Sequence, residues 1–219
     1  MEYLATIGEA LAIMTACWAI ISGVGAWKRE FIGRRKIELA EEVLATFFEV
    51  KDAVAYIRNP FSGGQEGKTR KSSADESQEE SELLNRGYIV YERYNDKKDT
   101  FTKFSTLKYR FMASFGSGTE SIFTDTSKIL NSIFLSAQML VTHYWQKQGL
   151  HQMDEGEWKN HLAEMQRHEG VFWDRMNDED KIRSKLSEIQ KRLDDITKSS
   201  FEEPMKTYSI LTNKWWGNG

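Results

Sequence analysis

The first hydrophobic pattern in the chain is continuous, because residues 10–27 (ALAIMTACWAIISGVGAW) contain no charged side chain. About 20 apolar residues, each rising 1.5 Å, cross a hydrocarbon core of about 30 Å, and the uncharged residues 3–8 add further length. Tyr3 and Trp27 lie near the two ends, where amphipathic rings favour the membrane interface. We therefore expect one transmembrane helix. A buried core helix of a soluble protein is the alternative.

Charged residues flank this segment unequally, since Glu2 and Glu9 precede it without any Lys or Arg, and five basic residues follow it within nine positions. The basic residues are Lys28, Arg29, Arg34, Arg35 and Lys36. The positive-inside rule then predicts an N-terminus outside and about 190 residues in the cytoplasm. A cleavable signal peptide has its basic residues before the apolar stretch, so we expect the anchor to be retained.

Small side chains recur along one face of the predicted span. They are Ala12, Ala16, Ala19, Gly23 and Ala26. Their spacing of three and four residues places them on one helical face, and small residues let two helices approach closely in lipid. We expect this face to contact a second copy of the chain or another membrane protein. The alternative is that Ala and Gly are simply common in membrane spans.

Beyond the span, the hydrophobic pattern acquires a helical period. Residues 37–57 carry an apolar stripe that continues the first helix from about Tyr3 to Ile57, and Pro60 is expected to end it. Four further helices are expected at about residues 81–114, 119–148, 155–173 and 178–199. The last has a heptad-like pattern, which predicts packing against the other helices or, alternatively, an intermolecular coiled coil. Its apolar positions are Ile182, Leu186, Ile189, Leu193 and Ile196.

The predicted fold class is all-α, with an N-terminal single transmembrane helix that continues into a cytoplasmic helical bundle. We divide the chain into a transmembrane anchor (1–27), the cytoplasmic continuation of the first helix (28–59), a flexible Gly- and Ser-rich loop (60–81), the helical bundle (82–200) and a tail (201–219). The tail lacks periodicity, which indicates a frayed end, although Lys214, Trp215 and Trp216 are residue types that favour a membrane surface.

Composition excludes several classes of function. The formal net charge is −3, so the chain has no overall basic field for nucleic acid. Cys17 is the single cysteine, which excludes an internal disulfide, a Cys-x-x-Cys redox pair and a cysteine-rich zinc site. The segment GGQEGKT at 63–69 resembles the end of a phosphate-binding loop, but Ser62 replaces its first glycine and no strand precedes it.

The strongest candidate for chemistry is a row of polar residues in the fourth predicted helix. Glu157, His161, Glu164 and His168 follow at spacings of four, three and four, so they share one helical face. His161, Glu164 and His168 are therefore candidate metal ligands. The alternative is a solvated polar face with ordinary side-chain pairs. No catalytic residue and no bound cofactor are predicted.

The segments REFIGRRKIELAEEVLATFFEVKDAVAYIRNPF, YERYNDKKDTFTKFSTLKYRFMASFG and HLAEMQRHEGVFW resemble a type of uncharacterised bacterial membrane-anchored helical protein, over most of residues 1–175. The resemblance implies a location in a bacterial inner membrane, and it brings no known activity with it, so it indicates nothing about catalysis. The expected function is a membrane-anchored, non-enzymatic interaction or scaffold module with the bilayer and a second copy or another membrane protein as partners. The alternatives are a metal-binding helical enzyme or sensor, and a membrane-perturbing effector.

Overall fold

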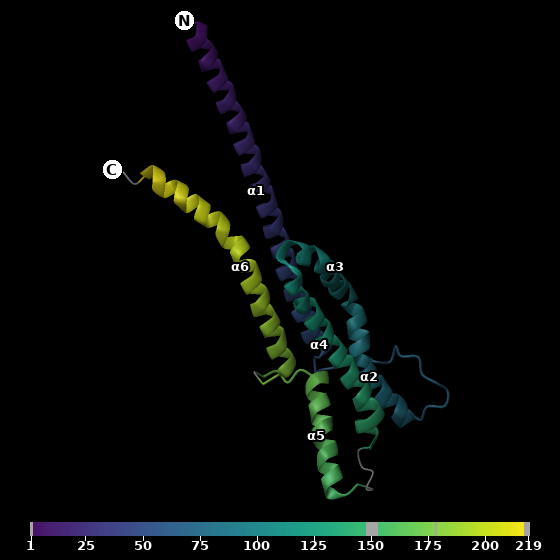
Figure 1. Cartoon of the computed structure of the whole chain (residues 1–219). Helices are drawn as coiled ribbons and strands as arrows, with labels where there is room; N and C mark the ends of the chain where they lie inside the picture. The colour runs from purple at the N-terminus through teal and green to yellow at the C-terminus, as the bar shows by residue number, and fades with distance from the viewer. Residues whose placement is uncertain (1, 148–152, 178, 217–219) are drawn as a thin grey trace. The chain divides into compact units, whose positions relative to one another are not determined.

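The computed structural model describes residues 2–147, 153–177 and 179–216, and these residues form an all-α protein without strands (Figure 1). The long helices are α1 (Glu2–Ile57), α2 (Gln78–Asp96), α3 (Lys98–Phe115), α4 (Glu120–Met139), α5 (Glu155–Phe172) and α6 (Lys181–Trp216). Three short elements are η1 (Ser117–Thr119), η2 (Leu140–Tyr144) and η3 (Trp145–Lys147). The chain divides into two compact units, residues 42–196 and residues 1–41 with 197–219. The all-α class and the helical bundle are confirmed.

Helix α1 is unbroken over 56 residues, as the absence of proline and turn residues predicts. It is long and apolar enough to cross a membrane by length and composition, since it contains an 18-residue window of mean hydropathy 1.7 of which none is buried. The Thr15 hydroxyl in this stretch donates to the Leu11 and Ala12 carbonyls of its own helix, both at 2.9 Å. The side chain therefore needs no water as hydrogen-bond partner.

Aromatic rings form the centre of the unit made by residues 42–196. Phe104 of α3 packs between Phe47 of α1 and Phe123 of α4, with ring centroids 5.7 and 4.7 Å apart, and Phe111 also contacts Phe123. Phe47, Phe104, Phe111 and Phe123 are all buried. Burying a side chain of this size stabilises a fold by about 1.5–3 kcal/mol. The apolar stripes predicted for these helices therefore meet in one core.

The expected single helix over 81–114 is wrong, because α2 ends at Asp96 and α3 begins at Lys98. Lys97 leaves helical geometry, with φ −108° and ψ 8°, directly after Asn95 and Asp96, which are poor helix formers. The break changes the buried face of α2. The α2 residues Tyr88, Tyr91 and Tyr94 are only partly buried, and the buried residues of the helix are Gly87, Ile89, Val90 and Arg93.

The third predicted helix also ends differently. It follows α4 to Met139, widens into the π-helical turn η2 and continues as η3 to Lys147; residues 148–152 lie outside those described. At this turn α2 approaches closely through Gly87, where a Cβ atom would lie 2.2 Å from Val141 Cγ2. A side chain on residue 87 would therefore collide with η2.

Helix α6 packs within the chain, which confirms the first of the two interpretations of its heptad-like pattern. Ile182, Leu186, Ile189 and Leu193 are buried, and Lys51 of α1 donates a hydrogen bond to Gln190. The helix continues to Trp216 through Pro204, and the frayed end expected for the tail stays a prediction. Proline removes one hydrogen-bond donor but has a φ close to the helical value. Side chains from residue 202 onward lie outside those described, including the predicted contact of Lys214, Trp215 and Trp216 with a membrane.

The segment between α1 and α2 is irregular, as predicted, and its contacts attach it to α2. Arg70 forms an ion pair with Glu76, and the Gly67 amide donates to Glu92. Gly67 has φ +81°, and a Cβ on it would lie 2.0 Å from the Asn85 carbonyl oxygen, so the turn requires glycine here. The flexibility expected for residues 60–81 stays a prediction.

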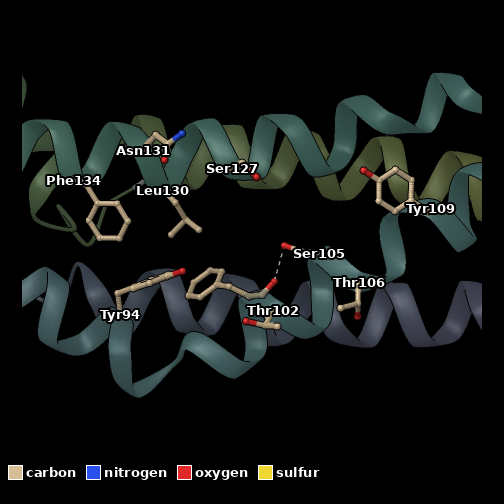
Figure 2. A pocket seen from close by; sticks show the side chains of 10 residues that line it. Tyr94, Thr102, Ser105, Thr106, Tyr109, Ser127, Leu130, Asn131 and Phe134 are labelled. Carbon is tan, nitrogen blue, oxygen red and sulfur yellow. Dashed lines mark hydrogen bonds between the residues drawn. The ribbon is translucent and has the colours of Figure 1, made fainter.

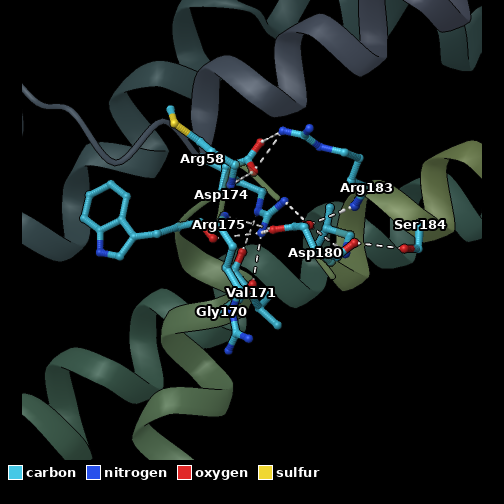
Figure 3. Close-up of polar contacts among 11 residues, drawn as sticks. Arg58, Gly170, Val171, Asp174, Arg175, Asp180, Arg183 and Ser184 are labelled. Carbon is cyan, nitrogen blue, oxygen red and sulfur yellow. Dashed lines mark hydrogen bonds and ion pairs between the residues drawn. The ribbon is translucent and has the colours of Figure 1, made fainter. Parts of the chain in front are cut away.

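A buried arginine joins the ends of three helices (Figure 3). Arg58 follows α1 directly and forms a bidentate pair with Asp180, with N–O distances of 2.8 and 2.7 Å. Its guanidinium also donates to carbonyls at the end of α5, those of Gly170 and Val171 in the last turn and that of Trp173 directly after it, at 2.8–3.0 Å. These carbonyls lack partners within their own helix, so Arg58 caps α5.

Asp180 completes the junction as the cap of α6. Its carboxylate accepts hydrogen bonds from the backbone amides of Ile182, Arg183 and Arg175 at 2.9–3.1 Å. Helix α6 begins at Lys181, directly after Asp180. Burial alone would raise the pKa of the Asp180 carboxyl. The hydrogen bonds from Arg58 and from the backbone amides have the larger combined effect and lower this pKa from 3.8 to about 2.

A second buried arginine caps α1. Arg93 of α2 donates to the carbonyls of Tyr56, Ile57, Asn59 and Phe61, at distances from 2.6 to 3.4 Å. It also pairs with Glu66 at 2.6 Å. Both arginines thus bind backbone carbonyls at helix ends where the described residues supply no glycine cap.

Candidate functional site

The candidate metal ligands lie on α5, opposite the π-helical turn η2. Tyr144, the last residue of η2, places its ring between the two histidines, 5.3 Å from the centroids of both His161 and His168. Trp158 stacks on His161, with ring centroids 5.4 Å apart. The Nε2 atom of His161 is buried and has no hydrogen-bond partner in the part of the chain that is described. The site is therefore an aromatic cluster around two imidazoles.

Both nitrogens of His168 already have partners. Arg167 Nη2 lies 3.1 Å from Nε2, and Ser136 Oγ of α4 lies 3.0 Å from Nδ1. A guanidinium can only donate, so Nε2 is the acceptor and Nδ1 carries the proton that it donates to Ser136. Burial and the positive charge of Arg167 lower the pKa of His168 below 6.5. The negative charge of Glu164 acts in the opposite direction but is the smaller effect. His168 is thus a neutral histidine that joins α5 to α4.

The two glutamates of the row have local partners. Glu164 is exposed and pairs with Arg167 at 2.7 Å, and this hydrogen bond lowers the pKa of the Glu164 carboxyl. Glu157 forms a capping box with Asp154 at the start of α5. The interpretation as a solvated polar face holds for these two carboxylates and is wrong for His168, which is buried.

This arrangement gives a weak geometry for a metal ion. Among the described residues, no three His, Cys, Asp or Glu side chains come together in a group that could hold one. His161, Glu164 and His168 share a face as expected, but binding through all three would require Arg167 to leave both Glu164 and His168. Metal binding by these residues stays a prediction.

A second feature is an open groove of about 680 Å³ between α3 and α4 (Figure 2). Tyr94, Phe101, Leu130 and Phe134 line one part of it. The remaining lining residues are Thr102, Ser105, Thr106, Tyr109, Ser127 and Asn131. None of these carries an acidic or basic side chain, so the groove offers contact area and hydrogen bonds without groups suited to acid–base catalysis at neutral pH.

The third feature is the small-residue face of α1. Because α1 is a continuous helix from Glu2, the predicted interface residues do share one face. Ala12, Ala16, Ala19, Gly23 and Ala26 are all exposed. A Cβ added at Gly23 would meet nothing within 4 Å. The face is therefore open along its length, as close approach of a second helix requires.

Sequence reasoning missed Ser136, Tyr144 and the buried arginines. Ser136 had a usable signal, since it lies in the apolar stripe of α4, three residues after Ile133 and four before Leu140. A polar residue in a buried stripe needs a partner, which here is His168. Tyr144 follows Leu140 by four residues and so continues the same stripe, but its position against the two histidines depends on the π-helical turn, which the hydrophobic pattern does not show.

Comparisons of the chain with protein-family models, with curated proteins and with solved structures found no match. The resemblance to bacterial membrane-anchored helical proteins gains no support from them. The function is therefore argued from the residues themselves.

Proposed function

We propose that this protein is a single-pass, membrane-anchored interaction module without enzymatic activity, located in a bacterial inner membrane. Residues 10–27 of α1 cross the bilayer, the N-terminus lies outside, and the helical bundle lies in the cytoplasm. The observation that carries the proposal is the uncharged, exposed stretch of α1 with basic residues close to one end only.

The exposure of this stretch is the first support. Large apolar side chains are more than half exposed throughout it, as in Ile13 at 64%, Trp18 at 73% and Ile21 at 71%. Soluble proteins rarely expose contiguous apolar patches of more than a few hundred Å². A hydrocarbon environment would remove this surface from water and leave the helical backbone fully hydrogen-bonded.

The unequal charges at the two ends of the apolar stretch favour its burial in a bilayer over its burial against a partner protein. A partner protein could bury the same apolar surface, but it would not require basic residues after the stretch and acidic residues before it. Glu9 lies immediately before residue 10, which is compatible with the outer headgroup level.

Self-association is the second part of the proposal. The face formed by Ala12, Ala16, Ala19, Gly23 and Ala26 would bring two copies of α1 into close backbone contact. Larger residues such as Ile13, Ile20 and Ile21 lie around the rest of the helix and would face lipid or the edge of the contact. Pairing of the spans would bring two bundles together beneath the membrane.

The hydrogen bonds and ion pairs of the polar side chains support a role in protein–protein interaction and not in catalysis. His168 and Glu164 are engaged with Ser136 and Arg167, and Asp180 with Arg58. The groove between α3 and α4 supplies an uncharged contact surface. These features hold helices together or present surface, and they leave the activation of a nucleophile without an evident base.

Membrane insertion and orientation can be tested together in spheroplasts and membranes of the expressing cell. We expect the full chain to resist carbonate washing and the bundle to resist protease added from outside. Release by carbonate would contradict the membrane span, and digestion of the bundle from outside would reverse the orientation.

Self-association is tested by crosslinking in membranes, comparing two identical substitutions on opposite faces. Gly23→Ile places a large side chain in the proposed contact, whereas Gly25→Ile lies about 200° away around the helix. A Cβ at Gly25 meets only the Arg29 side chain, at an ordinary 3.6 Å. We expect Gly23→Ile and Ala16→Ile to abolish the dimer and Gly25→Ile to retain it. Equal crosslinking of all variants would show that the small residues form no interface.

The two alternative functions can be separated from this proposal. A metal-binding enzyme or sensor would contain stoichiometric metal that is lost in the His161→Ala/His168→Ala variant. A membrane-perturbing effector would be toxic on overexpression in a manner that depends on the intact span. Either result would replace the proposed module with the corresponding function.

A further inference from the structure

We infer that α1 carries a binding surface for anionic phospholipid headgroups directly after the proposed span, formed by Lys28, Arg29, Arg35 and Lys36. This inference rests on the proposed membrane anchoring and adds the lipid class that the anchor selects. It goes beyond the orientation rule, which needs basic residues only on one side and in no particular arrangement.

The four basic residues form a continuous patch because of their spacing. Successive residues turn by about 100° around a helix, so Lys28, Arg29, Arg35 and Lys36 fall within about 120° of its circumference. All four side chains are exposed. The nearby acidic residues, Glu30 and Glu38, fall outside this sector. The patch is therefore a basic face on a helix that also carries acidic residues.

The fifth basic residue has a different role. Arg34 forms an ion pair with Glu30, one turn earlier, at 3.0 Å, and both side chains are exposed. Such an i, i+4 pair neutralises itself in place. We therefore exclude Arg34 from the lipid-binding surface.

A ladder of stacked groups borders the basic face. The Trp27 and Phe31 rings stack with centroids 5.8 Å apart, and the Arg35 guanidinium lies 5.1 Å from the Phe31 centroid. Tryptophan favours the membrane interface, so Trp27 sets the depth of the ladder. The cation–π contact orients Arg35 along the helix toward Trp27, which is the direction of the headgroups.

The depth of the patch matches the headgroup layer. One leaflet has about 5–7 Å of polar region outside the hydrocarbon. Lys28 and Arg29 follow Trp27 within this layer. Arg35 and Lys36 lie about 12–14 Å beyond Trp27 along the axis, and their long side chains can extend back toward the phosphates.

Phosphate-bearing anionic lipids fit this surface best. Basic clusters next to a span attract anionic headgroups, with a roughly five-fold gain in affinity for each Lys or Arg near the surface. Zwitterionic lipids carry no net charge and gain little from the same residues. The chain as a whole has a net charge of −3, so the attraction is local to this patch.

The inference is tested on the full chain reconstituted in phosphatidylcholine vesicles containing about 20 mol% phosphatidylglycerol. Spin-labelled phosphatidylglycerol and phosphatidylcholine report the fraction of each lipid held next to the protein. We expect at least a two-fold preference for phosphatidylglycerol in the wild type, reduced by added sodium chloride because salt screens surface charges. Sodium phosphate of equal ionic strength should reduce it no further, since the bound group is a lipid headgroup and not a free anion.

The test variant is Lys28→Gln/Arg29→Gln/Arg35→Gln/Lys36→Gln, in which we expect the preference to fall to about one-fold. The matched control is Lys98→Gln/Lys159→Gln/Lys181→Gln/Lys191→Gln, which removes the same charge from exposed positions far along the chain. The control should keep the wild-type preference. Equal preference in wild type and test variant, or equal loss in test variant and control, would overturn the inference.

Carbonate washing of the same vesicles distinguishes this result from failure of the anchor. If the wild type stays in the vesicles and shows no lipid preference, the lipid surface is wrong and the anchor stands. If the wild type is released, the proposed membrane span itself is wrong.

Discussion

Arg58 and Asp180, 122 positions apart in the sequence, form a bidentate ion pair with both side chains almost completely buried. The pair joins the end of α1 to the start of α6, and the same guanidinium binds the end of α5. Buried pairs of this kind are strongly destabilising when broken, because the remaining charge keeps its desolvation cost without its partner.

Breaking the pair should therefore have a large effect. We expect Asp180→Ala and Arg58→Met to lower the free energy of unfolding by about 3–5 kcal/mol each. The combined Arg58→Met/Asp180→Leu variant should lose less than the sum. The matched control is Arg110→Met, since Arg110 pairs with Glu42 at an exposed site and should contribute only about 0–1 kcal/mol. Urea unfolding of the full chain in detergent, followed by circular dichroism, measures all four.

The same pair predicts a dependence of stability on acid. The pKa of Asp180 is about 2 in the fold, below its usual value of 3.8, so its contribution is complete above about pH 4 and is lost as the pH falls toward 2. Other carboxylates titrate in this range, so the informative quantity is a difference between proteins. The stability gap between wild type and Arg58→Met/Asp180→Leu should narrow from pH 5 to pH 2. A constant gap would show that Asp180 does not titrate differently in the two states.

The contact between His168 and Ser136 gives a third prediction. Ser136→Ala leaves the His168 Nδ1–H buried without an acceptor, which should cost about 1–3 kcal/mol of unfolding free energy. Ser132→Ala is the control one turn earlier, since Ser132 donates only to the Ile129 carbonyl of its own helix. It should change stability by less than about 0.5 kcal/mol.

His168 should also make stability depend on pH near neutrality. Its pKa in the fold lies below 6.5, so the folded protein disfavours protonation and loses stability as the pH falls through 6.5 toward the lower folded value. The wild type should lose more stability between pH 7.5 and 5.5 than His168→Gln in the same urea experiment. Parallel losses would contradict a neutral His168.

The approach of α2 to η2 gives a fourth prediction. Gly87→Ala should destabilise the fold by about 1–3 kcal/mol, because its Cβ would overlap Val141 Cγ2, and this outweighs the gain of about 0.5–1 kcal/mol from helix propensity. Val141→Ala removes the colliding methyl group, so the double variant should be more stable than the two single effects added together. Gly33→Ala, which meets nothing within 4 Å, should cause no loss. Additive effects at 87 and 141 would contradict the collision.

Features that depend on the local spacing of apolar residues could be predicted from the sequence. Features that depend on hydrogen bonds to backbone groups distant in the sequence could not. The buried stripe of α6 follows from apolar spacing, and the unbroken α1 follows from the absence of proline and turn residues. Arg58 and Arg93 were not predicted as buried, since their partners are carbonyls at helix ends formed by other parts of the chain. The break at Lys97 was missed because tyrosines and phenylalanines continue on both sides of it and suggest one stripe.

For the candidate site, spacing correctly placed His161, Glu164 and His168 on one face of α5. Spacing could not show that Ser136 and Arg167 occupy both nitrogens of His168, since that depends on how α4 packs on α5. Whether the polar residues on this face of α5 are available to bind a ligand therefore depends on the side chains that α4 packs against them.

The long separation between Arg58 and Asp180 has a consequence during synthesis. A ribosome adds about 5–20 residues per second, so Arg58 is made about 6–24 s before Asp180. For most of that interval α5 has not been made, and throughout it the Arg58 guanidinium has no Asp180 to pair with. The junction of the three helices can close only after nearly the whole bundle has been translated, so a nascent chain stopped before Asp180 should hold Arg58 without its carboxylate partner.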